Sequence, residues 1–129
     1  MALVDTDVMV DVLRNYPPAL EWMRAQAAEA LVMPGFVLLE LIEGCRDKES
    51  QERVLRLAGG CDVAWLSDDG ANSALHLFAE HRLANGLDMI DALVGQTALE
   101  LGVPLLTFNQ KHYACIPGLM VEAPYGREV

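Results

Sequence analysis

Acidic residues stand beside apolar segments at three distant places in this chain of 129 residues. Asp5 ends the apolar run at residues 2–5, Glu40 lies in LLELIEG, and Asp91 lies in LDMIDALVG. A buried carboxylate without a partner is costly, and several that share one site repel each other. Acids in such positions are protonated, paired with a basic side chain, or bound to a cation.

A divalent cation resolves this repulsion, because the helices expected to carry Glu40 and Asp91 have no basic residue close to the acids. Mg²⁺ prefers oxygen ligands, binds through a small number of carboxylates and keeps several water molecules. Zinc fits less well, since no histidine or cysteine is placed to help and the three cysteines form no CxxC motif. We therefore expect a hard cation where these acids meet.

Small residues next to the acids leave space for a ligand. On a helix, Asp91 shares a face with Gly95, and Glu40 shares a face with Gly44. Asp88 lies on the same face as Asp91 and has two interpretations. It is either a further ligand or an acid that stabilises the positive N-terminus of its own helix.

Strands and helices are predicted to alternate along the chain. Strands are expected at residues 2–5, 31–34, 61–66 and 103–109, with a candidate fifth at 119–124. Helices are expected at about 8–15, 17–30, 35–45, 48–60, 67–86 and 87–102. Asp7 is expected to cap the first helix, Asp11 and Glu43 to be exposed, and the tail PYGREV to be loose.

This alternation favours an α/β domain spanning residues 1–129, with a mostly parallel sheet of four to five strands covered on both faces. In such sheets, ligands bind outside the carboxyl ends of the strands. Asp5 and Asn109 each end a predicted strand. We therefore expect both residues at the functional edge of the sheet.

Composition limits the class of protein. The formal net charge of −10 argues against an extended basic surface for nucleic acid, and it favours a bound cation or a basic partner. Solubility of a chain that is 53% hydrophobic is the alternative explanation of this acidity. The odd number of cysteines, the absence of a signal-peptide pattern and the lack of a membrane-spanning apolar stretch predict a cytoplasmic protein.

Four stretches carry a family resemblance, and they span almost the whole chain in order: LVDTDVMVDVL, LLELIEG, DALVGQTALELGVPLLTFNQKHY and IPGL. With them the chain resembles the PIN-domain family, specifically the VapC-type toxins of bacterial and archaeal toxin–antitoxin pairs. The resemblance implies a three-layer α/β/α fold and a Mg²⁺- or Mn²⁺-dependent ribonuclease. It also implies a homodimer and a cognate antitoxin, whose basic segment the acidic cleft would attract.

The family's three acids fall on Asp5, Glu40 and Asp91. By this resemblance Asp5 and Asp91 hold the metal, and Glu40 orients or deprotonates the attacking water. Four polar residues are expected to support them: Thr6, Asp88, Thr107 and Asn109. Lys111 and His112 stand where many relatives carry a fourth acid, so the resemblance leaves open whether one or two ions bind.

An acidic protein that cuts RNA needs positive charge near its site. The metal supplies part of that charge, and basic side chains supply the rest if they rim the cleft. The candidates are Arg14, Arg46, Lys48, Arg82 and Lys111. Apolar residues can serve the partner contacts, although core packing is the favoured role of Trp22, Met23 and Phe78.

Two other functions remain as alternatives. LVDTDVM also resembles the opening motif of haloacid-dehalogenase-type phosphatases, with Asp5 as nucleophile and Asp7 as acid, but no later lysine or paired-aspartate motif follows. The other alternative is a PIN-like interaction module without catalysis, for which the missing fourth acid is the support.

Overall fold

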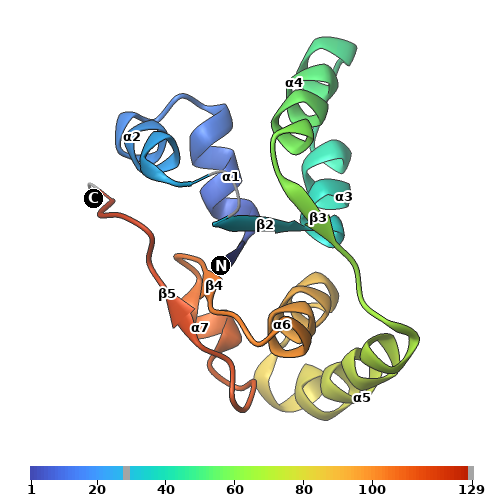
Figure 1. The fold of residues 1–129 in the computed structure, drawn as a ribbon. Coiled ribbons are helices and arrows are strands. Elements are labelled where there is room, and N and C mark those ends of the chain that lie inside the picture. Colours follow the sequence, from blue (N-terminus) through green and yellow to red (C-terminus); the bar gives the residue numbers. More distant parts are fainter. Residues whose placement is uncertain (28–29, 128–129) are drawn as a thin grey trace.

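The computed structural model describes residues 1–27 and 30–127, in which helices and strands alternate (Figure 1). The strands are β1 (Ala2–Val4), β2 (Leu31–Pro34), β3 (Asp62–Ala64), β4 (Leu105–Leu106) and β5 (Val121–Glu122). The helices are α1 (Thr6–Leu13), α2 (Pro17–Ala25), α3 (Gly35–Glu43), α4 (Lys48–Gly59), α5 (Asp68–Asn85), α6 (Met89–Leu101) and α7 (Gln110–Tyr113). Apart from the short α7, these elements follow the predicted order.

The strands form one parallel sheet in the order β3-β2-β1-β4-β5, which confirms the predicted α/β class. Helices α1–α4 cover one face and α5–α7 the other, so the fold has three layers (Figure 1). The chain steps outward from β1 to β2 and β3, then crosses to β4 on the other side of β1. Such a reversal opens a crevice at the carboxyl ends of the two central strands, here β1 and β4.

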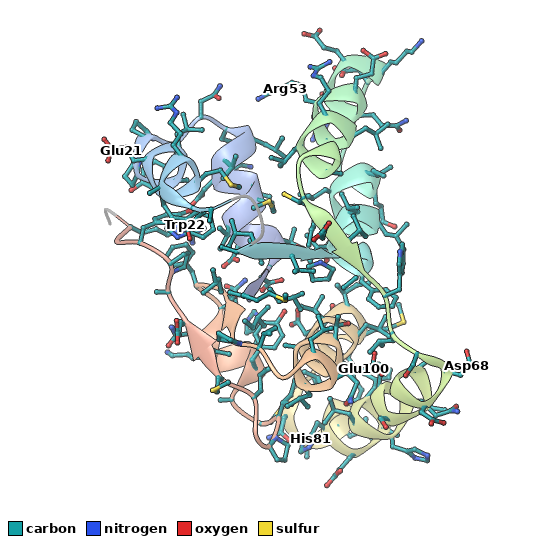
Figure 2. All side chains as sticks on the ribbon, viewed as in Figure 1. Glu21, Trp22, Arg53, Asp68, His81 and Glu100 are labelled. Carbon is teal, nitrogen blue, oxygen red and sulfur yellow. The ribbon has the colours of Figure 1, made fainter. Side chains whose placement is uncertain are left out.

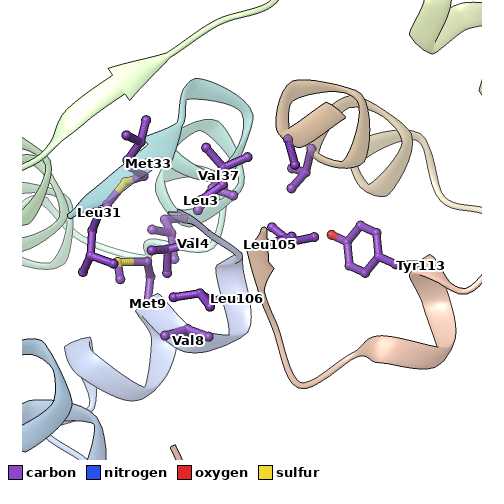
Figure 3. Close-up of a cluster of buried hydrophobic side chains, with 14 of the residues drawn as sticks. Leu3, Val4, Val8, Met9, Leu31, Met33, Val37, Leu105, Leu106 and Tyr113 are labelled. Carbon is purple, nitrogen blue, oxygen red and sulfur yellow. The ribbon is translucent and has the colours of Figure 1, made fainter. Parts of the chain in front are cut away.

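The central strands are buried from both sides, and side chains fill the space between the layers (Figure 2). The close-up in Figure 3 shows residues of β1 and β4 packed against α1 and α3. Leu3 and Leu105 are fully buried, and Val8 of α1 and Val37 of α3 are buried against them. This core holds the ends of β1 and β4 in fixed relative positions.

Three apolar residues, for which the sequence left partner contact or core packing as possible roles, pack against this core. Trp22, Met23 and Phe78 are all partly buried on it, as the core interpretation predicted.

None of the helices in the described ranges has both the length and the hydropathy needed to cross a membrane. All three cysteines are free thiols.

Several predicted boundaries shift. The N-cap of α1 is Asp5 and not Asp7, because the Asp5 carboxylate accepts a hydrogen bond from the Thr6 N–H at 2.8 Å. Helix α2 ends at Ala25 because the next residue, Gln26, is extended, whereas the helix was predicted to reach residue 30. Residues 28 and 29 of that prediction lie outside the described part of the chain.

The C-terminal segment is bound to the body of the protein, so the prediction of a loose tail is wrong for residues 124–127. The Tyr125 hydroxyl donates to Asp11 Oδ2 at 2.7 Å, and Arg127 Nε donates to the same oxygen at 3.0 Å. The Arg127 guanidinium also lies 4.0 Å from the centroid of the Phe108 ring. We call Tyr125 and Arg127 the C-terminal latch. Asp11 is consequently half-buried and not exposed as expected.

Arg127→Ala tests whether the latch contributes to stability. It removes the ion pair with Asp11 and the cation–π contact with Phe108, both partly open to water. We expect the free energy of unfolding to fall by about 1 kcal/mol. Urea denaturation measures this change, and Arg24→Ala on the exposed side of α2 is the control. Equal stability of the two variants would show that the latch contributes nothing measurable.

Candidate functional site

Asp5 is the most buried acid of the site and follows β1 directly. Its side chain is 4% exposed. Oδ2 accepts hydrogen bonds from the Thr107 hydroxyl at 2.8 Å and the Tyr113 hydroxyl at 3.0 Å, and Oδ1 accepts the Thr6 N–H. Burial raises the pKa of Asp5 to about 6, the negative charge of Asp7 adds to this effect, and the hydrogen bonds oppose it.

Tyr113 joins Asp5 to Asp91. Its hydroxyl oxygen is 3.0 Å from Asp5 Oδ2 and 3.1 Å from Asp91 Oδ1. The distance between these two carboxylate oxygens is therefore at most the sum of the two contact distances. Figure 3 shows the Tyr113 ring beside Leu105, with its oxygen directed into the cluster. A hydroxyl has one hydrogen and donates to only one of the two carboxylates. The second contact is a hydrogen bond only if a carboxylate carries a proton.

Asp91 lies in the first turn of α6 and is half-buried. Burial raises its pKa, the contact with the Tyr113 hydroxyl partly opposes this, and the charges of Asp88 and Glu40 raise the pKa further. His112 Nδ1 lies 3.8 Å from Asp91 Oδ2. A basic group from another element therefore does approach this acid, which the helix pattern alone did not indicate.

Glu40 and Thr6 lie beside this pair, in the wall of one open cavity between α1, α3 and α4. Within residues 1–27 and 30–127, the buried Thr6 hydroxyl has no hydrogen-bond partner. The charge of Glu40 acts on Asp91, as its effect on the pKa indicates. In the same described ranges, no three Asp, Glu, His or Cys side chains are grouped closely enough to form a metal site. The structure thus joins Asp5 to Asp91 and places Glu40 nearby.

The remaining predicted residues differ in their contacts. Thr107 is fully buried and, besides its bond to Asp5, accepts the Asn109 backbone N–H at 3.0 Å. Asn109 is exposed, and its backbone N–H connects it to Thr107, which in turn contacts Asp5. Asp88 is the N-cap of α6 and accepts the Ile90 N–H at 3.2 Å, which matches the helix N-terminus interpretation.

Two features of the site were not predicted. Asp7 accepts the Val8 N–H and the Phe108 N–H, each at 2.8 Å, and so fastens the start of α1 to the loop after β4. Both Asp7 oxygens therefore accept backbone N–H groups, which gives Asp7 a structural role at this end of α1. The other feature is Tyr113, which lies in a helix of four residues that no periodic pattern marks.

The fold and the site together define a three-layer α/β protein with a pair of carboxylates where its strand order reverses. The chain belongs to the PIN domain family, whose sequence pattern matches residues 2–115. A relative, Ribonuclease VapC19 of Mycobacterium tuberculosis, is 29% identical over 130 residues, which cover 97% of this chain and 100% of that protein.

Solved structures share this fold. A toxin–antitoxin complex from Klebsiella pneumoniae contains a chain that superimposes with a TM-score of 0.78 at 24% identity, covering 98% of this chain and 100% of that one. DNA-bound VapBC from Salmonella typhimurium also matches with a TM-score of 0.78, at 20% identity, over 95% of this chain and 97% of that one. These similarities establish the three-layer architecture.

Proposed function

We propose that this protein is a divalent-metal-dependent endoribonuclease and the toxin of a VapC-type toxin–antitoxin pair. The observation that carries the proposal is the Asp5–Tyr113–Asp91 group. It brings two carboxylates with raised pKa values to the carboxyl ends of the central strands. Membership of the PIN domain family and the relative named Ribonuclease VapC19 support a nuclease.

The residues of the site fit Mg²⁺ or Mn²⁺. The donors are carboxylate oxygens, which these ions prefer. The Thr6 hydroxyl, which has no hydrogen-bond partner in the described part of the chain, belongs to the residue after Asp5. We assign Asp5 and Asp91 as the residues that would hold the ion. When bound, the ion would make water more acidic and balance the negative charge that develops on the phosphate.

The chain's own groups complete the reaction. Glu40 would accept a proton from the attacking water as the water oxygen bonds to phosphorus and a phosphorus–oxygen bond of the RNA chain breaks. Thr107 and Tyr113 keep the Asp5 carboxylate in one orientation. Asp88, whose carboxylate caps α6, would add negative charge near Asp91.

The proposed partners follow from charge and exposure. A basic segment of a cognate antitoxin would be attracted to the acids of the site in a chain of net charge −10. A homodimer is part of the proposal as well, and exposed apolar residues of α5, among them Leu75 and Leu83, support a contact surface. RNA as substrate places the site of action in the cytoplasm.

An RNA-cleavage assay with and without metal tests the proposed function. We expect the purified protein to cut single-stranded RNA with Mg²⁺ or Mn²⁺, to stop in EDTA, and to recover when the ion is restored. Cleavage that continues in EDTA would contradict the metal-dependent reaction. A complete absence of cleavage in either ion would favour the interaction module without catalysis.

A further inference from the structure

The cavity beside the acids is large enough to hold part of an RNA chain. It has a volume of about 500 Å³ and lies between α1, α3 and α4. We call it the α1–α4 groove. Thr6 and Glu40 line it, so a ligand in the groove also contacts the edge of the candidate site. The groove is therefore a continuation of that site.

Three arginines and two acids line this groove, so its net charge is positive although the chain is strongly acidic. Arg14, Arg46 and Arg53 line it, which is three of the nine lysines and arginines of the chain. Arg14 and Arg46 were among the candidates for the rim of the cleft, and Arg53 was not. In contrast, the Arg82 guanidinium donates to the Leu87 carbonyl oxygen at 3.2 Å, at the end of α5.

The arginines are available to an external anion. Arg14 and Arg46 are exposed and form no ion pair within the described residues. Arg53 extends from α4 and donates to the Leu13 carbonyl oxygen, which fixes its position (Figure 2). The nearby Asp47 carboxylate caps α4 by accepting the Ser50 N–H at 2.7 Å, and within the described residues it forms no ion pair with these arginines.

Part of the wall is apolar and contains Val10, Leu13, Leu41 and Val54. Guanidinium groups bind phosphate oxygens through several donors at once, while apolar surface accepts the unstacked bases and ribose of a single strand. A polyanion with alternating charged and less polar parts matches this wall. Double-stranded nucleic acid, whose bases are stacked inside, would leave the apolar surface uncovered.

We propose that the α1–α4 groove binds the backbone of single-stranded RNA next to the bond that is cut, with Arg14, Arg46 and Arg53 as its phosphate contacts. This inference rests on the proposed ribonuclease function, because Glu40 connects the groove to the acids. The groove would hold the substrate, and the acids would act on the phosphate at its end.

Two measurements on the same variants test the groove. Binding of a fluorescein-labelled single-stranded RNA is followed by anisotropy in EDTA, and cleavage of that RNA is followed in Mg²⁺. For Arg14→Ala and Arg46→Ala, we expect affinity to fall roughly fivefold to tenfold. The slope of the logarithm of the binding constant against the logarithm of the salt concentration should decrease in magnitude by about one for each variant. In cleavage, KM should rise by the same factor while kcat stays within about twofold. Arg56→Ala, on the exposed side of α4 and outside the groove, is the matched control.

The outcomes separate this inference from the proposed function. If the wild-type protein cleaves RNA but the groove variants behave like Arg56→Ala in affinity, KM and salt slope, the groove assignment is wrong and the ribonuclease function stands. If the wild-type protein binds the RNA with the expected arginine dependence but never cleaves it, the groove assignment stands and the ribonuclease function fails.

Discussion

Asp91→Asn is expected to reduce RNA cleavage by on the order of 10³-fold in kcat/KM at saturating Mg²⁺. The amide keeps the size of the side chain but removes one of the two negative charges that would hold the ion. Folding should be preserved, because the amide oxygen still accepts the Tyr113 hydroxyl that now contacts Asp91 Oδ1 at 3.1 Å. Single-turnover cleavage of an RNA oligonucleotide measures the loss.

Asp69→Asn is the matched control for this variant. It makes the same chemical change at an exposed aspartate of α5, away from the Asp5–Tyr113–Asp91 group. Its activity should stay within about twofold of the wild type. Wild-type activity in Asp91→Asn would remove this residue from the reaction and require another set of ligands.

The second large effect concerns stability and pH in the absence of metal. The pKa of Asp5 is raised from 3.8 to about 6 in the folded protein, chiefly by burial. The folded state therefore binds more protons than the unfolded state between about pH 4 and pH 6, and the free energy of unfolding falls as pH rises through this range. Asp5 alone should contribute a loss of about 3 kcal/mol. Asp7 and Asp91, whose pKa values are also raised, act in the same direction.

Asp5→Asn isolates this contribution. Its amide oxygen can accept the Thr6 N–H, and its amide nitrogen can donate to the hydroxyl oxygens of Thr107 and Tyr113. These two hydrogen bonds then run in the opposite direction, because in the wild type both hydroxyls donate to Asp5. In EDTA, the variant should match the wild type near pH 4 and be more stable than it above pH 6. Urea denaturation across this range measures the difference.

Metal should bring the two proteins to nearly the same stability at neutral pH. At pH 7, Mg²⁺ at 100 times its dissociation constant should stabilise the wild type by about 2.7 kcal/mol and leave Asp5→Asn almost unchanged. A wild-type stability that does not respond to Mg²⁺, combined with a more stable Asp5→Asn, would show that the acids only repel each other. That result would favour the non-catalytic module.

The parts of the fold that follow from local pattern could be predicted from the sequence. Asp5 could be identified as a candidate site residue because a surface carboxylate has little reason to follow an apolar strand directly. The helix ends at Gly86 and Gly102 were equally visible, and both glycines adopt the left-handed conformation that favours this residue. Parallel strands then bring Asp5 and the end of β4 to the same edge of the sheet.

Contacts between distant segments could not be predicted in this way. Tyr113 reaches Asp5 and Asp91 only because α7 folds back against α6, and QKHY has no periodicity that indicates a buried tyrosine. The C-terminal latch depends in the same way on Asp11 and Phe108, which are remote from Arg127 in the chain. Arg53 was missed because charge counting does not show which arginines share one groove.

A crystal structure of the protein grown with Mn²⁺ tests the central claim most directly, because anomalous scattering identifies the ion without assumptions about its ligands. We expect one strong peak at roughly 2 Å from a carboxylate oxygen of Asp5 and from one of Asp91. The ion should then lie beside the Tyr113 hydroxyl, which contacts both acids in the metal-free protein. A well-ordered site with no peak there, or with Mn²⁺ bound only elsewhere, would contradict the account.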